Sequence, residues 1–335
     1  MLCGYDAVRF IFERGVGFFI NRGVSSIQQS EITASTRACA VFGQPIRHSA
    51  SPAMHNAAMR ELGLNWRYLG FEVAPVQLRQ ALEGCRAMRF AGVNLTVPHK
   101  ILALDMMDAL DETARNWGAV NTVAYEARMQ DGSWKPLGQV DVTGPAEIRM
   151  VGYNTDADAI VRSLVDDLGC DPVGKRVVIL GAGGAGRVAA LRLAQAGVAG
   201  LWLVNRTRDK AAEVGEAIRK KFPAVSVQVG YPVAGEKVDL VLNATSLGLS
   251  ATDVLPWDPA VFALGQARFA YDMIYRPAVT PFLAKAGESG LKTANGIGML
   301  LYQGAKALEI WSGRNVPVDV MRRALVENVY GGGKT

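Results

Sequence analysis

Residues 175–186 read Lys-Arg-Val-Val-Ile-Leu-Gly-Ala-Gly-Gly-Ala-Gly, and this stretch decides the fold of the second half of the chain. Its apolar, β-branched start predicts a buried strand. Gly181, Gly183 and Gly186 then follow in G-x-G-x-x-G spacing, and an alanine-rich helix is expected over 185–196. The spacing alone is weak evidence, but between a strand and a helix it is typical of a dinucleotide-binding turn. Gly181 permits the tight turn, Gly183 lets the backbone approach a pyrophosphate, and Gly186 allows close packing, while the helix N-terminus attracts phosphate.

A second strand is expected over 201–204, and the residues after it indicate which dinucleotide is bound. NAD-binding domains usually carry Asp or Glu here, to hold the ribose 2′-hydroxyl. This chain has Asn205, Arg206, Thr207 and Arg208 instead. Two guanidinium groups and a hydroxyl suit a 2′-phosphate, so the pattern favours NADP. The alternative is a glycine-rich turn that binds nothing or another nucleotide.

Composition limits the remaining possibilities. The chain has 335 residues, half of them hydrophobic, which suffices for two domains with sizeable cores. The net charge of +5 is spread without a dense basic stripe, so nucleic acid is not an expected partner. Four scattered cysteines and three histidines predict neither a metal site nor a disulfide framework. No uninterrupted apolar stretch is long enough for a membrane span, and we expect a cytoplasmic protein, monomeric or homodimeric.

The first half alternates between short apolar runs and helical patterns, which predicts an α/β domain with a mainly parallel sheet. Strands are expected over 38–43, 66–72, 90–96 and 119–124. Helices are expected over 51–62, 75–85, 98–110 and 111–117, the first with Ser51 as its N-cap. Residues 127–150 have an irregular pattern that suits a hairpin or a surface excursion.

The later elements suggest how the chain divides. A helix is expected from Thr155-Asp156 to about Gly169, with a capping-box-like spacing, and strands over 238–243 and 269–273. Two last helices, over 298–311 and 318–330, have no strand partner after them and are expected to fold back onto the first domain. A loosely ordered extension is expected over 1–35, with a targeting segment as the alternative. A substrate domain over 36–155 plus 299–330 and a Rossmann-type domain over 156–298 would then enclose a cleft.

Two clusters in the first half carry candidate chemistry. Ser49 and Ser51 precede a helix N-terminus, where hydroxyls, backbone N–H groups and the helix dipole can hold a carboxylate. Lys100 follows Pro98 at a predicted helix start, where the dipole disfavours a cation. An unfavourable placement of this kind points to function, although a solvated surface lysine is the plain alternative.

Three further clusters offer polar groups at element ends. Asn121 lies at a strand edge and Asp156 at a helix start, where an acid is most often a helix-charge residue. Met299 and Gln303 are four residues apart and share one helical face, from which Gln303 could reach a cleft or make an ordinary interdomain hydrogen bond.

Taken in order, these clusters resemble the shikimate dehydrogenase family over about residues 38–330. The shared motifs are Ser-x-Ser-Pro-x-x-His-Asn at 49–56, Asn-Leu-Thr-Val-Pro-His-Lys at 94–100, Gly-Ala-Val-Asn-Thr at 118–122, Asn-Thr-Asp at 154–156, the glycine turn with Asn-Arg-Thr at 205–207, and Gly-x-Gly-Met-Leu-x-x-Gln at 296–303. Six separated motifs make the resemblance highly specific.

The resemblance implies an oxidoreductase that interconverts 3-dehydroshikimate and shikimate with NADP, on the route to aromatic amino acids. It implies that Lys100 and Asp156 form a catalytic pair, which we treat as one titrating unit. It places the substrate at Ser49, Ser51, Thr96, Asn121, Tyr275 and Gln303. It places the cofactor at Gly181, Gly183, Gly184, Ala185, Gly186, Asn205, Arg206, Thr207, Arg208, Met273, Gly296 and Met299. No metal is required.

Two alternatives remain at this point. One is a quinate, dual quinate/shikimate or aminoshikimate dehydrogenase, since a single ring substituent separates these substrates. The other is a non-catalytic dinucleotide sensor, because a fold alone does not establish turnover. Retention of both Lys100 and Asp156 argues against the sensor.

Overall fold

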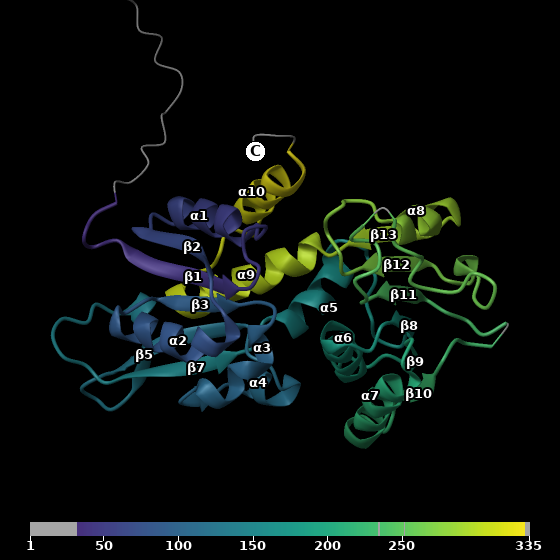
Figure 1. The fold of residues 1–335 in the computed structure, drawn as a ribbon, viewed down its shortest axis with the longest axis horizontal. Coiled ribbons are helices and arrows are strands. Elements are labelled where there is room, and N and C mark those ends of the chain that lie inside the picture. Colours follow the sequence, from purple (N-terminus) through teal and green to yellow (C-terminus); the bar gives the residue numbers. More distant parts are fainter. Residues whose placement is uncertain (1–31, 234, 251, 332–335) are drawn as a thin grey trace, which may run out of the picture. The chain divides into compact units, whose positions relative to one another are not determined.

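The computed structural model describes residues 32–331, apart from 234 and 251. These residues belong to a single compact unit. Most of the extension predicted over 1–35 lies outside the described residues. Within the described part, two sheets form two lobes connected by helices (Figure 1).

The first lobe is built on a seven-stranded sheet with the order β2-β1-β3-β5-β7-β4, to which β6 adds at β5. Its strands are β1 (Arg37–Gly43), β2 (Trp66–Glu72), β3 (Gly92–Leu95), β4 (Ala109–Leu110), β5 (Thr122–Arg128), β6 (Trp134–Pro136) and β7 (Ile148–Tyr153). Its own helices are α1 (Ser51–Glu61), α2 (Leu78–Ala87), α3 (His99–Leu102) and α4 (Glu112–Trp117). Among the described strands only β5 runs against the others, so the sheet is mainly parallel, as expected.

The second lobe is a six-stranded parallel sheet with the order β10-β9-β8-β11-β12-β13. Its strands are β8 (Arg176–Leu180), β9 (Gly200–Val204), β10 (Ser226–Val229), β11 (Leu240–Asn243), β12 (Phe269–Asp272) and β13 (Lys292–Asn295), and its helices are α6 (Gly184–Gln195), α7 (Arg208–Lys221) and α8 (Pro281–Glu288). This is the strand order of a doubly wound dinucleotide-binding fold. Ligands of such sheets bind beyond the carboxyl ends of the strands, where the order reverses, which here is beyond β8.

Alternating burial explains why both sheets are stable. Cys39 and Val41 pack into one cluster, whereas Ala40 and Phe42 pack into another on the opposite face of the first sheet. In β8 successive residues likewise alternate between two clusters. Strands covered on both faces read as continuous apolar runs, which is why β1 and β8 were recognisable from sequence.

Two helices connect the lobes, and the end of the chain then returns to the first lobe. Helix α5 (Asp156–Asp166) packs against both α6 and α9 (Ile297–Ser312), and α10 (Val318–Tyr330) packs on α1. The last two helices, α9 and α10, both contact α1 of the first lobe. Trp311 of α9 is fully buried and donates its indole N–H to the Val123 carbonyl at 3.0 Å. A Cβ at Gly92 would lie 2.0 Å from that indole nitrogen, so only glycine fits beneath it.

Several predictions about local structure were wrong. The N-cap of α1 is Ala50, and Ser51 is the first helical residue. The helix predicted over 98–110 ends at Leu102, because Leu104–Met106 forms a 3₁₀ turn and Ala109–Leu110 pairs with β7. The strand β7 itself was missed inside and beyond the segment expected to be irregular, although the predicted hairpin exists between β5 and β6.

The predicted capping box at α5 is also wrong. Thr155 occupies the N-cap position but makes no side-chain cap bond. Instead, the Asn154 side-chain oxygen accepts hydrogen bonds from the backbone N–H groups of Asp156 and Ala157, at 3.1 and 3.3 Å. The amide thereby satisfies two of the free donors at the helix start and fixes where Asp156 begins.

Of the helices in the described ranges, none combines the length and the apolar character needed to cross a membrane.

Candidate active site

A cavity of about 630 Å³ lies where residues of the two lobes meet, and both lobes contribute its walls. The first lobe and the start of α5 supply predicted site residues, namely Ser49, Ser51, Thr96, Lys100 and Asp156. The second lobe, with the loop after β12 and helix α9, supplies the rest, namely Ala185, Met273, Tyr275, Gly296, Met299 and Gln303. Residues separated by up to 254 positions are thus gathered around one space that is large enough for a substrate and part of a cofactor.

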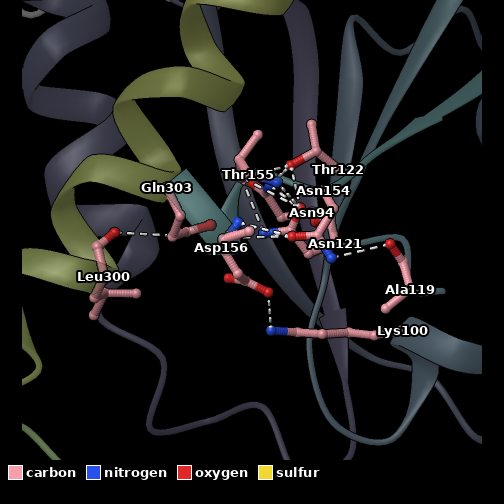
Figure 2. Close-up of polar contacts among 11 residues, drawn as sticks. Asn94, Lys100, Ala119, Asn121, Thr122, Asn154, Thr155, Asp156, Leu300 and Gln303 are labelled. Carbon is pink, nitrogen blue, oxygen red and sulfur yellow. Dashed lines mark hydrogen bonds and ion pairs between the residues drawn. The ribbon is translucent and has the colours of Figure 1, made fainter. Parts of the chain in front are cut away.

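Lys100 and Asp156 form an ion pair at the cavity wall (Figure 2). The Lys100 Nζ lies 2.7 Å from the Asp156 Oδ2, and their side chains are 33% and 13% exposed. Lys100 comes from the single turn of α3 and Asp156 from the first position of α5. The carboxylate offsets the unfavourable placement of an ammonium at a helix start, and it leaves the ammonium in contact with the cavity.

The hydroxyl residues of the first lobe surround the same space. Ser51 is 6% exposed, and its backbone N–H donates to the Ser49 hydroxyl at 3.4 Å. Thr96 follows directly after β3. Ser51 is the first residue of α1, so its hydroxyl lies at a helix start, where the dipole favours an anion.

The structure places Asn121 differently from the other predicted substrate residues. Asn121 is 1% exposed and is not part of the cavity wall. Its amide donates to the Thr155 hydroxyl at 2.9 Å and accepts from the Thr155 backbone N–H at 2.8 Å. The Asn121 Nδ2 uses one of its two hydrogens in these bonds, so the amide keeps one donor although it lies outside the cavity wall.

A neighbouring asparagine, Asn94, reaches the cavity wall instead. It is held by Tyr68, Thr122 and Asn121, and sequence analysis assigned no role to Asn94, Tyr68 or Thr122. One sequence signal could have indicated them: the dipeptide Asn-Thr occurs at 121–122 and again at 154–155, and the two copies bond to each other.

Gln303 and Tyr275 complete the wall opposite. The Gln303 Nε2 donates to the Leu300 carbonyl at 2.8 Å, within its own helix (Figure 2), so its side-chain oxygen keeps its accepting capacity. Burial raises the pKa of the Tyr275 phenol above its usual value, so this hydroxyl remains a neutral donor.

The glycine turn has the close contacts that its sequence predicts. A Cβ at Gly186 would lie 2.0 Å from the Gly181 carbonyl oxygen, and Gly181 has a φ of +104°. Gly183 and Gly184 are different, because a Cβ there would meet no protein atom within 4 Å. Both are exposed at the start of α6, so the open space in front of them is available to a ligand.

The basic loop after β9 is tied to this turn by one side chain. The Asn205 Oδ1 accepts from the Ala182 backbone N–H at 3.0 Å, and its Nδ2 donates to the Thr207 carbonyl at 2.8 Å. Arg206, Thr207 and Arg208 are exposed. Within the described part of the chain, neither arginine has a hydrogen-bond or ion-pair partner, so both guanidinium groups are available to an anion. The turn, the helix start and these cations together fit NADP.

The loop that carries Met273 and Tyr275 is anchored by a buried acid that sequence analysis missed. Asp272 accepts from the Thr280 hydroxyl, the Asn243 side-chain amide and the Ile274 backbone N–H, at 2.6, 3.1 and 3.0 Å. Burial raises the pKa of its carboxyl group, although these three hydrogen bonds oppose the effect.

Taken together, the cavity wall offers an ammonium held by a carboxylate, hydroxyls suited to an anion, and Ala185 of the dinucleotide-binding turn. Such an arrangement can deliver a proton to an oxygen that gains negative charge. Among the described residues, no group of three or more His, Cys, Asp or Glu side chains could hold a metal ion.

Comparison with known proteins gives a consistent result. Family models match residues 41–123 (shikimate dehydrogenase substrate binding domain), 160–250 (shikimate / quinate 5-dehydrogenase) and 296–326 (shikimate 5′-dehydrogenase C-terminal domain). The shikimate dehydrogenase (NADP(+)) of Desulforamulus reducens is 40% identical over 307 residues, which cover 90% of this chain and 98% of that protein.

Two solved structures extend the comparison. A shikimate dehydrogenase crystallised with NADP+ is 33% identical and superposes with a TM-score of 0.75, covering 90% of this chain and 98% of the other. The ligand-free 5-ketofructose reductase of Gluconobacter sp. strain CHM43 is also 33% identical, with a TM-score of 0.73 over 89% of this chain and 100% of the other.

Proposed function

The chain belongs to the shikimate dehydrogenase family, and we propose on this basis that it reduces 3-dehydroshikimate to shikimate with NADPH, reversibly. The observation that carries the proposal is the Lys100–Asp156 ion pair of 2.7 Å in the wall of a cavity that also contains Ser49 and Ser51. A carboxylated ring with a keto group requires both an anion site and a proton donor.

We assign the roles as follows. The Ser49 and Ser51 hydroxyls and the start of α1 hold the substrate carboxylate, and Thr96, Tyr275 and Gln303 surround the ring. Asn121 either contacts a ring hydroxyl through its remaining amide hydrogen or acts by holding Thr155 in place. Gly181–Gly186 and Asn205–Arg208 hold the phosphates, while Met273, Gly296 and Met299 receive the nicotinamide end. We divide the chain into a substrate domain, formed by residues 36–155 and 299–330, and an NADP domain, formed by residues 156–298.

The cofactor supplies the hydride, and the chain's own groups manage the charge that results. Addition of hydride to a ketone turns the carbonyl oxygen into an alkoxide. The Lys100 ammonium stabilises that oxygen and donates a proton to it, while Asp156 keeps the ammonium directed at the cavity. In the oxidative direction the pair takes the proton back as one unit.

The test is a steady-state assay of the full chain with four substrates and two cofactors. We expect turnover of 3-dehydroshikimate and of shikimate, with NADPH and NADP+ preferred over NADH and NAD+. Quinate tests the ring substituent, and 5-ketofructose, which has no carboxylate, tests the need for Ser49 and Ser51. Turnover of 5-ketofructose without turnover of 3-dehydroshikimate would overturn the proposal.

A further inference from the structure

A series of hydrogen-bonded, buried polar side chains extends along the cavity wall, from β2 of the first sheet to the start of α5. The Tyr68 hydroxyl lies 2.8 Å from the Asn94 Oδ1, and the Asn94 Nδ2 lies 2.9 Å from the Thr122 hydroxyl. The Thr122 hydroxyl is in turn 3.2 Å from that of Thr155, the residue before Asp156. Figure 2 shows the part of this hydrogen-bonded series from Asn94 to Thr155, next to Asp156.

Backbone groups fix the direction of the hydrogen bonds that Asn94 makes in this series. The Asn94 Nδ2 lies 3.2 Å from the Asn121 backbone carbonyl, which can only accept. The Asn94 amide nitrogen must therefore face Asn121, and its oxygen must face Tyr68. Since that oxygen can only accept, the Tyr68 hydroxyl is obliged to donate. Asn121 is oriented in the same way by the Thr155 backbone N–H, which can only donate.

These fixed directions determine which hydrogen-bonding group Asn94 can offer to a ligand. Both hydrogens of its amide are taken, one by the Asn121 carbonyl and one by the Thr122 hydroxyl. Its oxygen accepts one hydrogen bond from Tyr68 and has a second lone pair. Because Asn94 belongs to the cavity wall, the group that it presents there is an acceptor.

Tyr68 is itself held rigidly. Its ring is fully buried and stacks on the His55 ring, with centroids 4.0 Å apart and an interplanar angle of 10°. The His55 Nδ1 lies 2.9 Å from the Ser51 carbonyl, which requires that this nitrogen carry the hydrogen. Burial raises the pKa of the Tyr68 phenol well above its usual value, so the hydroxyl keeps the proton that it donates.

We propose that Tyr68 is a positioning residue, which touches no substrate but fixes Asn94 so that the cavity offers a carbonyl oxygen to a ring hydroxyl. The inference rests on the proposed function and deepens it, because it concerns how a polyhydroxylated ring is selected. Without the Tyr68 hydroxyl, the Asn94 oxygen loses the only donor that the described residues give it. The two bonds of the Asn94 Nδ2 remain, but the oxygen is no longer fixed in the geometry that the ring hydroxyl requires.

The test compares two tyrosine variants in the full chain, Tyr68→Phe and Tyr125→Phe. Tyr125 is also fully buried in the first lobe, and its hydroxyl donates to the Leu82 carbonyl at 2.9 Å, outside the cavity. Both variants lose one buried hydroxyl, so we expect similar decreases in Tm. Only Tyr68→Phe should raise the KM for shikimate, by about tenfold, because a buried hydrogen bond is worth about that factor. The KM for NADP+ should change less than about twofold in both.

A second measurement separates positioning from a merely structural role. Analogues of shikimate that lack one ring hydroxyl each are assayed with the wild-type protein and with Tyr68→Phe. For one analogue, kcat/KM with the wild-type protein should be lower than kcat/KM for shikimate. The same difference should be much smaller with Tyr68→Phe, because the variant already lacks the oriented acceptor. Thr122→Val removes the hydroxyl that accepts a hydrogen bond from the Asn94 Nδ2 and nearly preserves the side-chain volume. This variant should also raise the KM for shikimate.

The outcomes distinguish the two proposals. A wild-type protein without shikimate turnover would refute the proposed function. An active wild-type protein whose KM for shikimate is the same in Tyr68→Phe and Tyr125→Phe would refute the role of Tyr68 alone. Analogue penalties that are equal in the wild-type protein and the variant would do the same. If Tyr68→Phe fails to fold, Thr122→Val tests whether the orientation of Asn94 governs ring binding, and an unchanged KM for shikimate in that variant would refute the proposal.

Discussion

The two lobes prepare their halves of the site in opposite ways. The polar groups of the first lobe are already paired: Lys100 with Asp156 at the start of α5, and Asn94 with Tyr68 and Thr122. In the second lobe, the described structure gives Arg206 and Arg208 no partner, and the glycines in front of α6 face open space.

This difference has a physical cause. Buried polar groups must be satisfied whether or not a ligand is bound, since an unpaired one costs about 1–3 kcal/mol. Exposed guanidinium groups are solvated by water and need no protein partner. We therefore expect the first lobe to hold its geometry without ligand and the second lobe to gain much of its order from the dinucleotide phosphates.

The largest effect should come from Lys100→Ala, which removes the preformed proton donor. We expect kcat to fall roughly 10²- to 10⁴-fold, the usual contribution of general acid–base catalysis, with little change in the KM for NADPH. Lys285→Ala is the matched control, because Lys285 forms an ion pair of the same 2.7 Å length, with Glu288, but both ends are more than half exposed. Loss of kcat in the control, or its retention in Lys100→Ala, would break the contrast between the lobes.

The next effect concerns pH and the buried part of the first lobe. Burial lowers the pKa of His55 from 6.5 to about 4. Between these values the unfolded chain binds a proton that the folded chain does not, so the free energy of unfolding falls as the pH decreases from 6.5 to 4. By pH 4 the loss from this group is about 3 kcal/mol. Burial also lowers the pKa of His99, which adds a loss in the same direction.

Urea unfolding of the wild-type protein and of His55→Asn at several pH values measures this loss. Asparagine keeps an N–H donor for the Ser51 carbonyl but does not titrate, so the variant should be less sensitive to acid. Asp272 acts in the opposite direction through its raised pKa, and comparing the two proteins cancels its contribution. Equal pH dependence in both proteins would show that His55 is not held neutral by burial.

The sequence was sufficient for the features that depend on neighbouring residues. The strand over 176–180 and the glycine turn were recognisable because burial on both faces and the close approach of Gly186 to Gly181 leave a local pattern. The Lys100–Asp156 pair was predicted only through the family resemblance, since 56 residues separate its members.

Features that depend on tertiary pairing were not predictable. Residues 98–110 have helical composition, but Ala109 and Leu110 leave the helix to pair with β7, which was itself missed. The role of Tyr68 depends on bonds to residues far along the chain and on the fixed polarity of a backbone carbonyl. No periodicity in the sequence reports such polarity.

The smallest effect should come from Arg206→Ala in the second lobe, and it tests the other half of the comparison. If this guanidinium group binds the 2′-phosphate, its loss should raise the KM for NADPH by about 10- to 100-fold. This factor corresponds to the binding free energy of one or two hydrogen bonds to a charged group. The KM for NADH and the Tm should stay near their wild-type values, since Arg206 has no partner in the described structure to lose.

Two controls make this result specific. Arg60→Ala removes an exposed arginine from the last turn of α1 in the other lobe and should change neither KM. Added salt should raise the KM for NADPH in the wild-type protein more than in Arg206→Ala, because screening weakens only a charge that is still present. Equal losses with NADPH and NADH would mean that Arg206 supports the loop held by Asn205 rather than the phosphate, and the second lobe would then be preorganised like the first.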